Sequence, residues 1–259
     1  PRAGRDPAAV RTRPFPPAAS WPGAALLLAL ATVAAGAPGA APPRLEKLGR
    51  EYREHRLAVR PDLATLAGDR RGDGRLEPVT QATLLAEAEW LRGFAARLEA
   101  VPRDGLPPAG LSLRDSLAAR VARQRDELEV TRRWERDPSA YLDLAGAAMR
   151  PLLEGRGVAA CARARALAKR LERVPDVLRA ARVNLREPPR RLLEEALAGY
   201  ERLLAFYREE LPAFGARCRE PRTQADLAEA DTLAVRAAED FLRYLREDLL
   251  PRAAATTEP

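Results

Sequence analysis

Apolar residues beyond residue 43 recur at alternating spacings of three and four, and this periodicity constrains the fold more than any other feature. Side chains with that spacing lie on one face of an α-helix, which is buried when helices pack together. No stretch of four or more residues alternates convincingly with the period of two that a half-buried strand requires. The clearest helical series consists of Leu193, Leu197, Tyr200, Leu204, Tyr207 and Leu211.

Glycine and proline divide these periodic segments where helices should end, as in the predicted loop at residues 102–110. Ser112 with Asp115, and Thr223 with Asp226, have the spacing of capping boxes, which places two helix starts at Ser112 and Thr223. We predict an all-α fold, an antiparallel multi-helix bundle of about seven or eight helices joined by short connections.

Residues 1–43 have the composition of a signal peptide with a flanking segment rich in proline and alanine. The apolar run at 24–37 follows a basic stretch and is shorter than the about 20 residues that span a bilayer. Its length suits the apolar region of a secretory signal, and a buried core helix is the alternative. We expect export to the periplasm or the extracellular space, transient membrane contact through the signal peptide, and a helical domain over residues 44–259.

The two ends of the sequence also carry information. The chain begins with Pro1, and its only methionine is Met149, although the signal-like segment is present. We therefore expect residues to be missing before Pro1, because processing would have removed the whole segment. Residues 256–259 contain no recognisable element that would end the domain, so the sequence leaves open whether the chain is also truncated at its C-terminus.

The charge distribution argues against a nucleic-acid partner. The chain has 44 basic and 37 acidic residues, a formal net charge of +7. Four arginines and one aspartate lie in the first 43 residues, and acidic and basic residues are mixed throughout the rest. Nucleic-acid surfaces concentrate positive charge in a patch, often with aromatic side chains that stack on bases, and only 5% of this chain is aromatic.

A scarcity of histidine and cysteine limits the chemistry available to this chain. His55 is the only histidine, so the sequence lacks the His-Glu-x-x-His motif that binds zinc through two imidazoles on one helical face. We expect His55 to be a helix histidine that is either satisfied by a hydrogen bond or partly exposed. Cys161 lies on an alanine-rich face and is expected to be a small buried residue rather than a nucleophile. A disulfide with Cys218 stays open, because separation in sequence gives no distance.

No serine lies in a Gly-x-Ser-x-Gly motif, so the pattern of a serine nucleophile is also missing. We assign no catalytic, cofactor-binding or metal-binding residue to this chain.

Three stretches carry a resemblance to a known family. They are Pro61-Asp-Leu-Ala-Thr-Leu-Ala-Gly-Asp69, Trp134-Glu-Arg-Asp-Pro-Ser-Ala-Tyr141, and residues 170–185 followed by Pro188-Pro189. Their order and separations resemble the N-terminal helical half of the bacterial domain-of-unknown-function 885 family, over residues 44–255. The resemblance implies an exported, mostly helical protein similar to zinc metallopeptidases of the gluzincin type.

The zinc-binding His-Glu-x-x-His of that family lies in its C-terminal half, which this chain does not contain. No catalytic residue can therefore be transferred. For the parent protein the resemblance implies zinc and a peptide substrate, with the C-terminal catalytic half as the partner of this chain.

The residues of the three stretches favour packing roles. Trp134 and Tyr141 could hold two helices together through their rings and polar ends, and Asn184 could cap a turn or end a helix. A substrate-binding role for these residues is the alternative. Our interpretation is the N-terminal helical region of an exported metallopeptidase-like protein, inactive alone. The alternative is a self-sufficient exported helical binding or scaffold protein.

Overall fold

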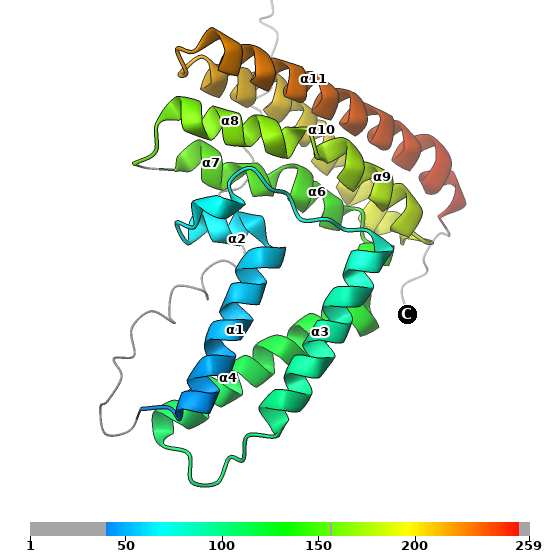
Figure 1. Cartoon of the computed structure of the whole chain (residues 1–259). Helices are drawn as coiled ribbons and strands as arrows, with labels where there is room; N and C mark the ends of the chain where they lie inside the picture. Colours follow the sequence, from blue (N-terminus) through cyan, green and yellow to red (C-terminus); the bar gives the residue numbers. More distant parts are fainter. Residues whose placement is uncertain (1–39, 156, 254–259) are drawn as a thin grey trace, which may run out of the picture.

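The computed structural model describes residues 40–155 and 157–253, and every regular element within them is helical (Figure 1). The prediction of an all-α fold is confirmed. The signal-like run at 24–37 lies outside the described residues. No helix in the described part of the chain has the length and apolar character needed to cross a membrane.

Three helices form one unit, which we call the arm: α1 (Pro43–Val59), α3 (Gln81–Glu99) and α4 (Pro108–Arg125) (Figure 1). Each turns its apolar face toward a shared core, in which Leu45, Leu91, Phe94 and Leu117 are almost fully buried. Gln124 of α4 donates a hydrogen bond of 2.8 Å to the hydroxyl group of Tyr52 on α1.

The later helices form a second and larger unit, which we call the body. Within its core the rings of Tyr200 and Phe241 lie 5.1 Å apart between their centroids. Buried alanines on α8 and α11, among them Ala164 and Ala234, leave room for the two helices to approach closely. The body comprises α6 (Ser139–Ala145), α7 (Arg150–Glu154), α8 (Ala160–Leu171), α9 (Val174–Asn184), α10 (Arg190–Gly215) and α11 (Pro221–Tyr244), with short helical turns at Ala147–Met149, Leu245–Leu249 and Leu250–Arg252.

Within the described residues the chain passes between the arm and the body three times: at Arg60, at residues 73–80 and at Arg132. Short elements lie beside each passage. At the last of these, Arg132 has a left-handed backbone with φ of 47°. The elements beside these passages are α2 (Pro61–Leu66) and the 3₁₀ turn Arg70–Gly72 on the body, the π turn Asp126–Thr131 that extends α4, and α5 (Arg133–Arg136).

The two predicted helix starts are wrong. Helix α4 begins at Pro108, ahead of Ser112, and α11 begins at Pro221, ahead of Thr223. Proline suits the first helical position because its fixed φ fits the helix and it has no N–H group to leave unpaired. The hydroxyl group of Thr223 donates instead to Oε2 of Glu220, at 2.9 Å.

Cys161 and Cys218 form a disulfide, with their sulfur atoms 2.09 Å apart and their Cα atoms 4.6 Å apart. The bond joins the first turn of α8 to the connection between α10 and α11. It closes a chain segment with a sequence separation of 57 residues.

We predict that the double variant Cys161→Ser/Cys218→Ser loses about 2–4 kcal/mol of unfolding free energy, because the bond no longer restricts the unfolded chain. Denaturant titration of the oxidised protein and the variant measures the loss. Wild-type protein in reductant is the matched control and should lose a similar amount. An unfolding midpoint that does not change on reduction would contradict the prediction.

Candidate functional site

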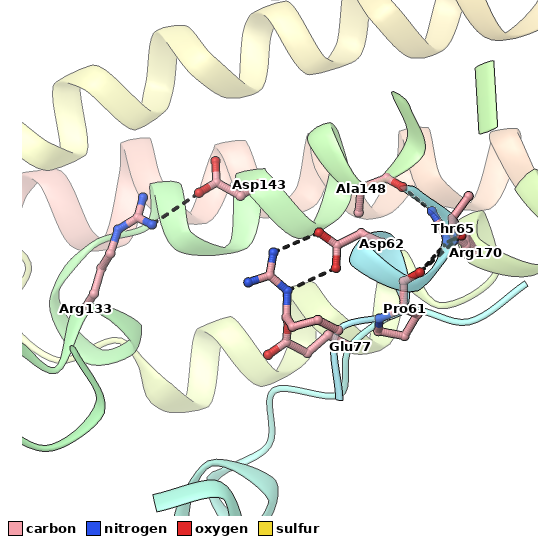
Figure 2. Close-up of polar contacts among 9 residues, drawn as sticks. Pro61, Asp62, Thr65, Glu77, Arg133, Asp143, Ala148 and Arg170 are labelled. Carbon is pink, nitrogen blue, oxygen red and sulfur yellow. Dashed lines mark hydrogen bonds and ion pairs between the residues drawn. The ribbon is translucent and has the colours of Figure 1, made fainter. Parts of the chain in front are cut away.

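The fully buried Arg170 of α8 holds α2 and the 3₁₀ turn Arg70–Gly72 against the body (Figure 2). Its Nη2 donates to the hydroxyl group of Thr65 at 2.6 Å, and to the carbonyl oxygens of Pro61 and Gly72 at 3.2 Å each. Its Nη1 donates to the carbonyl oxygen of Ala148. Burial of the guanidinium group lowers the pKa of Arg170 to about 10. The contacts therefore join α2, the 3₁₀ turns Arg70–Gly72 and Ala147–Met149, and α8 at one buried point.

Glycine is required at position 72 by this arrangement. A Cβ atom there would lie 2.9 Å from the carbonyl oxygen of Pro61 and 2.8 Å from Cβ of Ala64. Glycine at position 72 thus lets the 3₁₀ turn Arg70–Gly72 approach α2.

A second buried contact is formed by Asn184, the last residue of α9. Its Nδ2 donates to the carbonyl oxygen of Val79 at 2.7 Å and to the hydroxyl group of Tyr141 at 3.0 Å. The Tyr141 hydroxyl group donates in turn to the carbonyl oxygen of Trp134. Burial raises the pKa of Tyr141 to about 12, so the phenol stays a donor at neutral pH. Asn184 therefore joins separate segments, and its amide does not cap the turn that follows.

These two contacts bring together the three stretches that carry the family resemblance. Arg170 connects the third stretch to the first, and Asn184 connects the third to the second. The packing roles expected for Trp134 and Tyr141 fit this geometry, because Nε1 of Trp134 also donates to the carbonyl oxygen of Leu128, at 3.1 Å.

Between the arm and the body lies a cluster of charged side chains centred on Arg60, which we call the junction cluster. The guanidinium group of Arg60 donates to both carboxylate oxygens of Asp62, at 3.0 and 2.8 Å, and its Nε lies 3.0 Å from Oε2 of Glu77. Figure 2 shows Asp62 and Glu77 on the same side of α2. The cluster thus joins the end of α1, the first turn of α2 and the chain that leads to α3.

The body contributes a second part of the junction cluster through α5 and α6. Nε of Arg133 donates to Asp137 at 2.8 Å. Its Nη1 donates to Asp143 at 3.2 Å, as Figure 2 shows. Burial raises the pKa of Asp143, and the charge of Arg60 acts in the opposite direction, so the two parts of the cluster interact electrostatically.

Two carboxyl groups of the junction cluster titrate near neutral pH. Desolvation by burial raises the pKa of Glu77 to about 7 and that of Asp143 to about 7, against the lowering effect of their arginine partners. Burial also acts to raise the pKa of Asp62, but the charge and hydrogen bonds of Arg60 outweigh it and the pKa is lowered. The side chains of Glu77 and Asp143 remain 25% and 22% exposed, so both groups can exchange protons with solvent.

Sequence reasoning missed the junction cluster, although one signal was present. Arg60, Glu77 and Asp137 each directly precede a proline. A residue before proline is held in extended backbone and so tends to mark the end of a helix. Charged residues at such ends could have been proposed as a group, but their proximity follows only from the tertiary fold.

His55 behaves as predicted, with Nε2 2.6 Å from Oε2 of Glu87 and its ring stacked on Trp90 at a centroid distance of 3.4 Å. All three residues belong to the arm. Since the chain has one histidine, this arrangement gives zinc a single imidazole.

One group of possible metal ligands occurs among the described residues, and it does not fit zinc. Cys161, Cys218 and Glu220 place one ligand atom each within 4.8 Å of the others. Zinc binds thiolates, and both sulfur atoms are held in the disulfide.

A surface hollow of about 360 Å³ lies between α8 and α11. It is lined by charged side chains of both signs, including Lys169 and Glu229, and by the exposed Leu233. The hollow is separate from the residues of the junction cluster.

Fold and site together define an all-helical protein of two units joined through a charged junction. Residues 61–259 match the family of bacterial proteins of unknown function DUF885, and the chain belongs to that family.

Among solved structures, the fold is similar to "a putative lipoprotein of unknown function from Shewanella oneidensis", with a TM-score of 0.73 and 17% sequence identity. The similarity covers 82% of this chain and 39% of that chain, so this protein spans well under half the length of its structural neighbour. No curated protein matches the sequence.

We predict that Arg170→Met lowers the unfolding free energy by about 3 kcal/mol, because methionine fills the space but leaves buried oxygen atoms without donors. Arg173→Met is the matched control, since the Arg173 side chain is 65% exposed and pairs only with Asp176 among the described residues. Denaturant titration should give a large loss for the first variant and almost none for the second. Equal losses would contradict the role assigned to Arg170.

Proposed function

We propose that this chain is the N-terminal helical region of a longer exported protein similar to zinc metallopeptidases, and that it is inactive alone. The observation that carries the proposal is the DUF885 match over residues 61–259, combined with a structural neighbour of which this chain covers only 39%. In the parent protein the zinc-binding motif belongs to the C-terminal half that the resemblance implies.

The donor atoms of the described residues support this division of roles. Catalytic zinc takes three protein ligands and keeps one position for water. His55 is bound to Glu87, and the sulfur atoms of Cys161 and Cys218 are bound to each other. A zinc-dependent activity would therefore need ligands from another part of the protein.

In the proposed parent protein the arm and body form one wall of the peptide-binding cleft. The buried contacts of Arg170 and Asn184 fix the connecting segments to the body part of this wall, as a support for a catalytic half requires. The partly exposed carboxyl groups of Glu77 and Asp143 supply polar groups on the side where arm and body meet.

Export is part of the same proposal. The apolar run at 24–37 has the length of a signal sequence, and structural disulfides persist mainly in oxidising compartments. The Cys161–Cys218 bond and the neighbour's name as a lipoprotein agree with a periplasmic or extracellular location.

The test compares residues 44–259 with the product of the whole reading frame. The shorter protein should hold no stoichiometric zinc and cleave no peptide, whereas the whole product should bind about one zinc ion per catalytic site and hydrolyse an unstructured peptide mixture. Elemental analysis and amine release measure the two properties.

A stop codon directly after residue 259 would contradict the proposal and favour a self-sufficient binding or scaffold protein. Stoichiometric zinc together with peptidase activity in the shorter protein would also contradict it. Chelation of the longer protein, followed by restoration of activity with zinc, is the control that separates metal dependence from loss of folding.

A further inference from the structure

A surface groove lies between α8 and α11 of the body. Residues within 165–172 on α8 and 226–233 on α11 line its hollow of about 360 Å³, so it follows two turns of each helix. The two helices lie side by side (Figure 1). Ala168 and Ala230 line the hollow and are almost fully buried, so small side chains form its floor. We call this feature the α8–α11 groove, and two helical turns make it about 10 Å long.

One end of the α8–α11 groove is held by the disulfide. Cys161 lies in the first turn of α8, and Cys218 lies just before the start of α11 at Pro221. Both helices therefore run in the same direction away from the bond. Because their starts are fixed relative to each other, less ordering is needed when a ligand binds between them.

The charged side chains of the groove do not neutralise one another. Arg165 pairs outside the groove, because its Nη1 lies 2.5 Å from Oε2 of Glu220, which is not a lining residue. The other charged lining residues are exposed, and none of them forms an ion pair within the part of the chain that the structure describes. They are one lysine and three acids, Lys169, Glu172, Asp226 and Glu229. The groove therefore has an excess of negative charge.

The stem of Lys169 packs on the connecting segment at Gly74. A Cβ atom at position 74 would lie 2.9 Å from Cδ of Lys169, so the lack of a side chain there permits the contact. With its stem in this position, the lysine forms no ion pair with Asp226 or Glu229 across the groove. The two carboxylates of α11 are thus available to a cation that a ligand supplies.

The spacing of these carboxylates suits an organic cation better than a metal ion. Among the described residues, the acids of the groove belong to no group of three donor atoms within 4.8 Å of one another. A guanidinium group carries five N–H donors spread over a rigid plane, so it can reach carboxylates that are separated. Its planar shape also fits a floor of alanine side chains.

We propose that the α8–α11 groove binds an arginine side chain of an extended peptide. Its guanidinium group lies at Asp226 and Glu229, and an apolar side chain of the same peptide lies on Leu233. The proposal is independent of the metallopeptidase-like parent protein, because it concerns binding that needs neither zinc nor a catalytic half.

The dimensions of the groove support this ligand. Leu233 is 44% exposed and lies one helical turn beyond Glu229. One turn of helix advances about 5–6 Å, and side chains two positions apart in an extended peptide lie about 6–7 Å apart on the same face. An arginine and an apolar residue two positions apart can therefore contact both sites, while the arginine stem lies on the alanine floor.

Calorimetric titration of the chain as given, with its disulfide oxidised, tests the proposal. The ligands are two capped pentapeptides of alanine that carry arginine and leucine at the second and fourth positions, in either order. At least one should bind with a Kd of about 1 mM or tighter. The matched peptides carry citrulline, a neutral analogue of arginine, and should bind at least about fivefold more weakly because the ion pair is lost.

The double variant Asp226→Asn/Glu229→Gln should weaken binding of the arginine peptide at least about fivefold. Glu89→Gln/Glu209→Gln, which changes two exposed acids on α3 and α10, is the matched control and should bind as the wild type does. Lys169→Met should bind the peptide more tightly, because it removes a competing ammonium group from the groove.

Each side chain changed in these variants is exposed, and circular dichroism verifies that the proteins are folded. If the double variant does not fold, Leu233→Lys replaces it: the new ammonium group lies one turn from Glu229, competes with the ligand and should weaken binding. No binding of either arginine peptide, equal binding of the citrulline peptides, or wild-type affinity in the groove variants would overturn the proposal.

Discussion

The structure depends on one constraint: the arm and the body share no buried apolar side chain among the described residues, and the charged junction cluster lies where they meet. Burial of a charged side chain costs desolvation free energy, which pairing and hydrogen bonding must offset. Arg60 satisfies this condition by binding both Asp62 and Glu77, and Arg133 does so by binding Asp143. With two separate hydrophobic cores, each unit depends on its own helix packing.

Buried polar contacts compensate for this division on the body side. Arg170 uses one guanidinium group to fix four separate backbone or hydroxyl oxygen atoms, and Asn184 fixes the chain before α3 to α6. Hydrogen bonds of this kind contribute little individually but are costly to leave unmade in a buried place. Arg170 connects the third of the three stretches to the first, and Asn184 connects the third to the second, so segments far apart in sequence are joined at buried points.

Much of the fold could be predicted from the sequence, because the periodic series through Leu193 and Leu211 depends only on local geometry. The starts of α4 and α11 could not, because prolines at position 108 and position 221 competed with the more familiar preference for Ser112 and Thr223. Neither the Arg60–Glu77 pair nor the disulfide could be derived, since both depend on how distant segments pack. The structural role of His55 in a helix could be predicted because it is the only histidine in the sequence.

The independence of the two cores is tested most directly by native-state hydrogen exchange, read by mass spectrometry in oxidised and reduced protein. If the cores are separate, the opening free energy for the amides of α1, α3 and α4 should be at least about 1 kcal/mol lower than that for the amides of α8, α10 and α11. Reduction of the disulfide should lower the opening free energy of the body and leave that of the arm unchanged. A single opening free energy for all six helices, falling equally on reduction, would contradict the account.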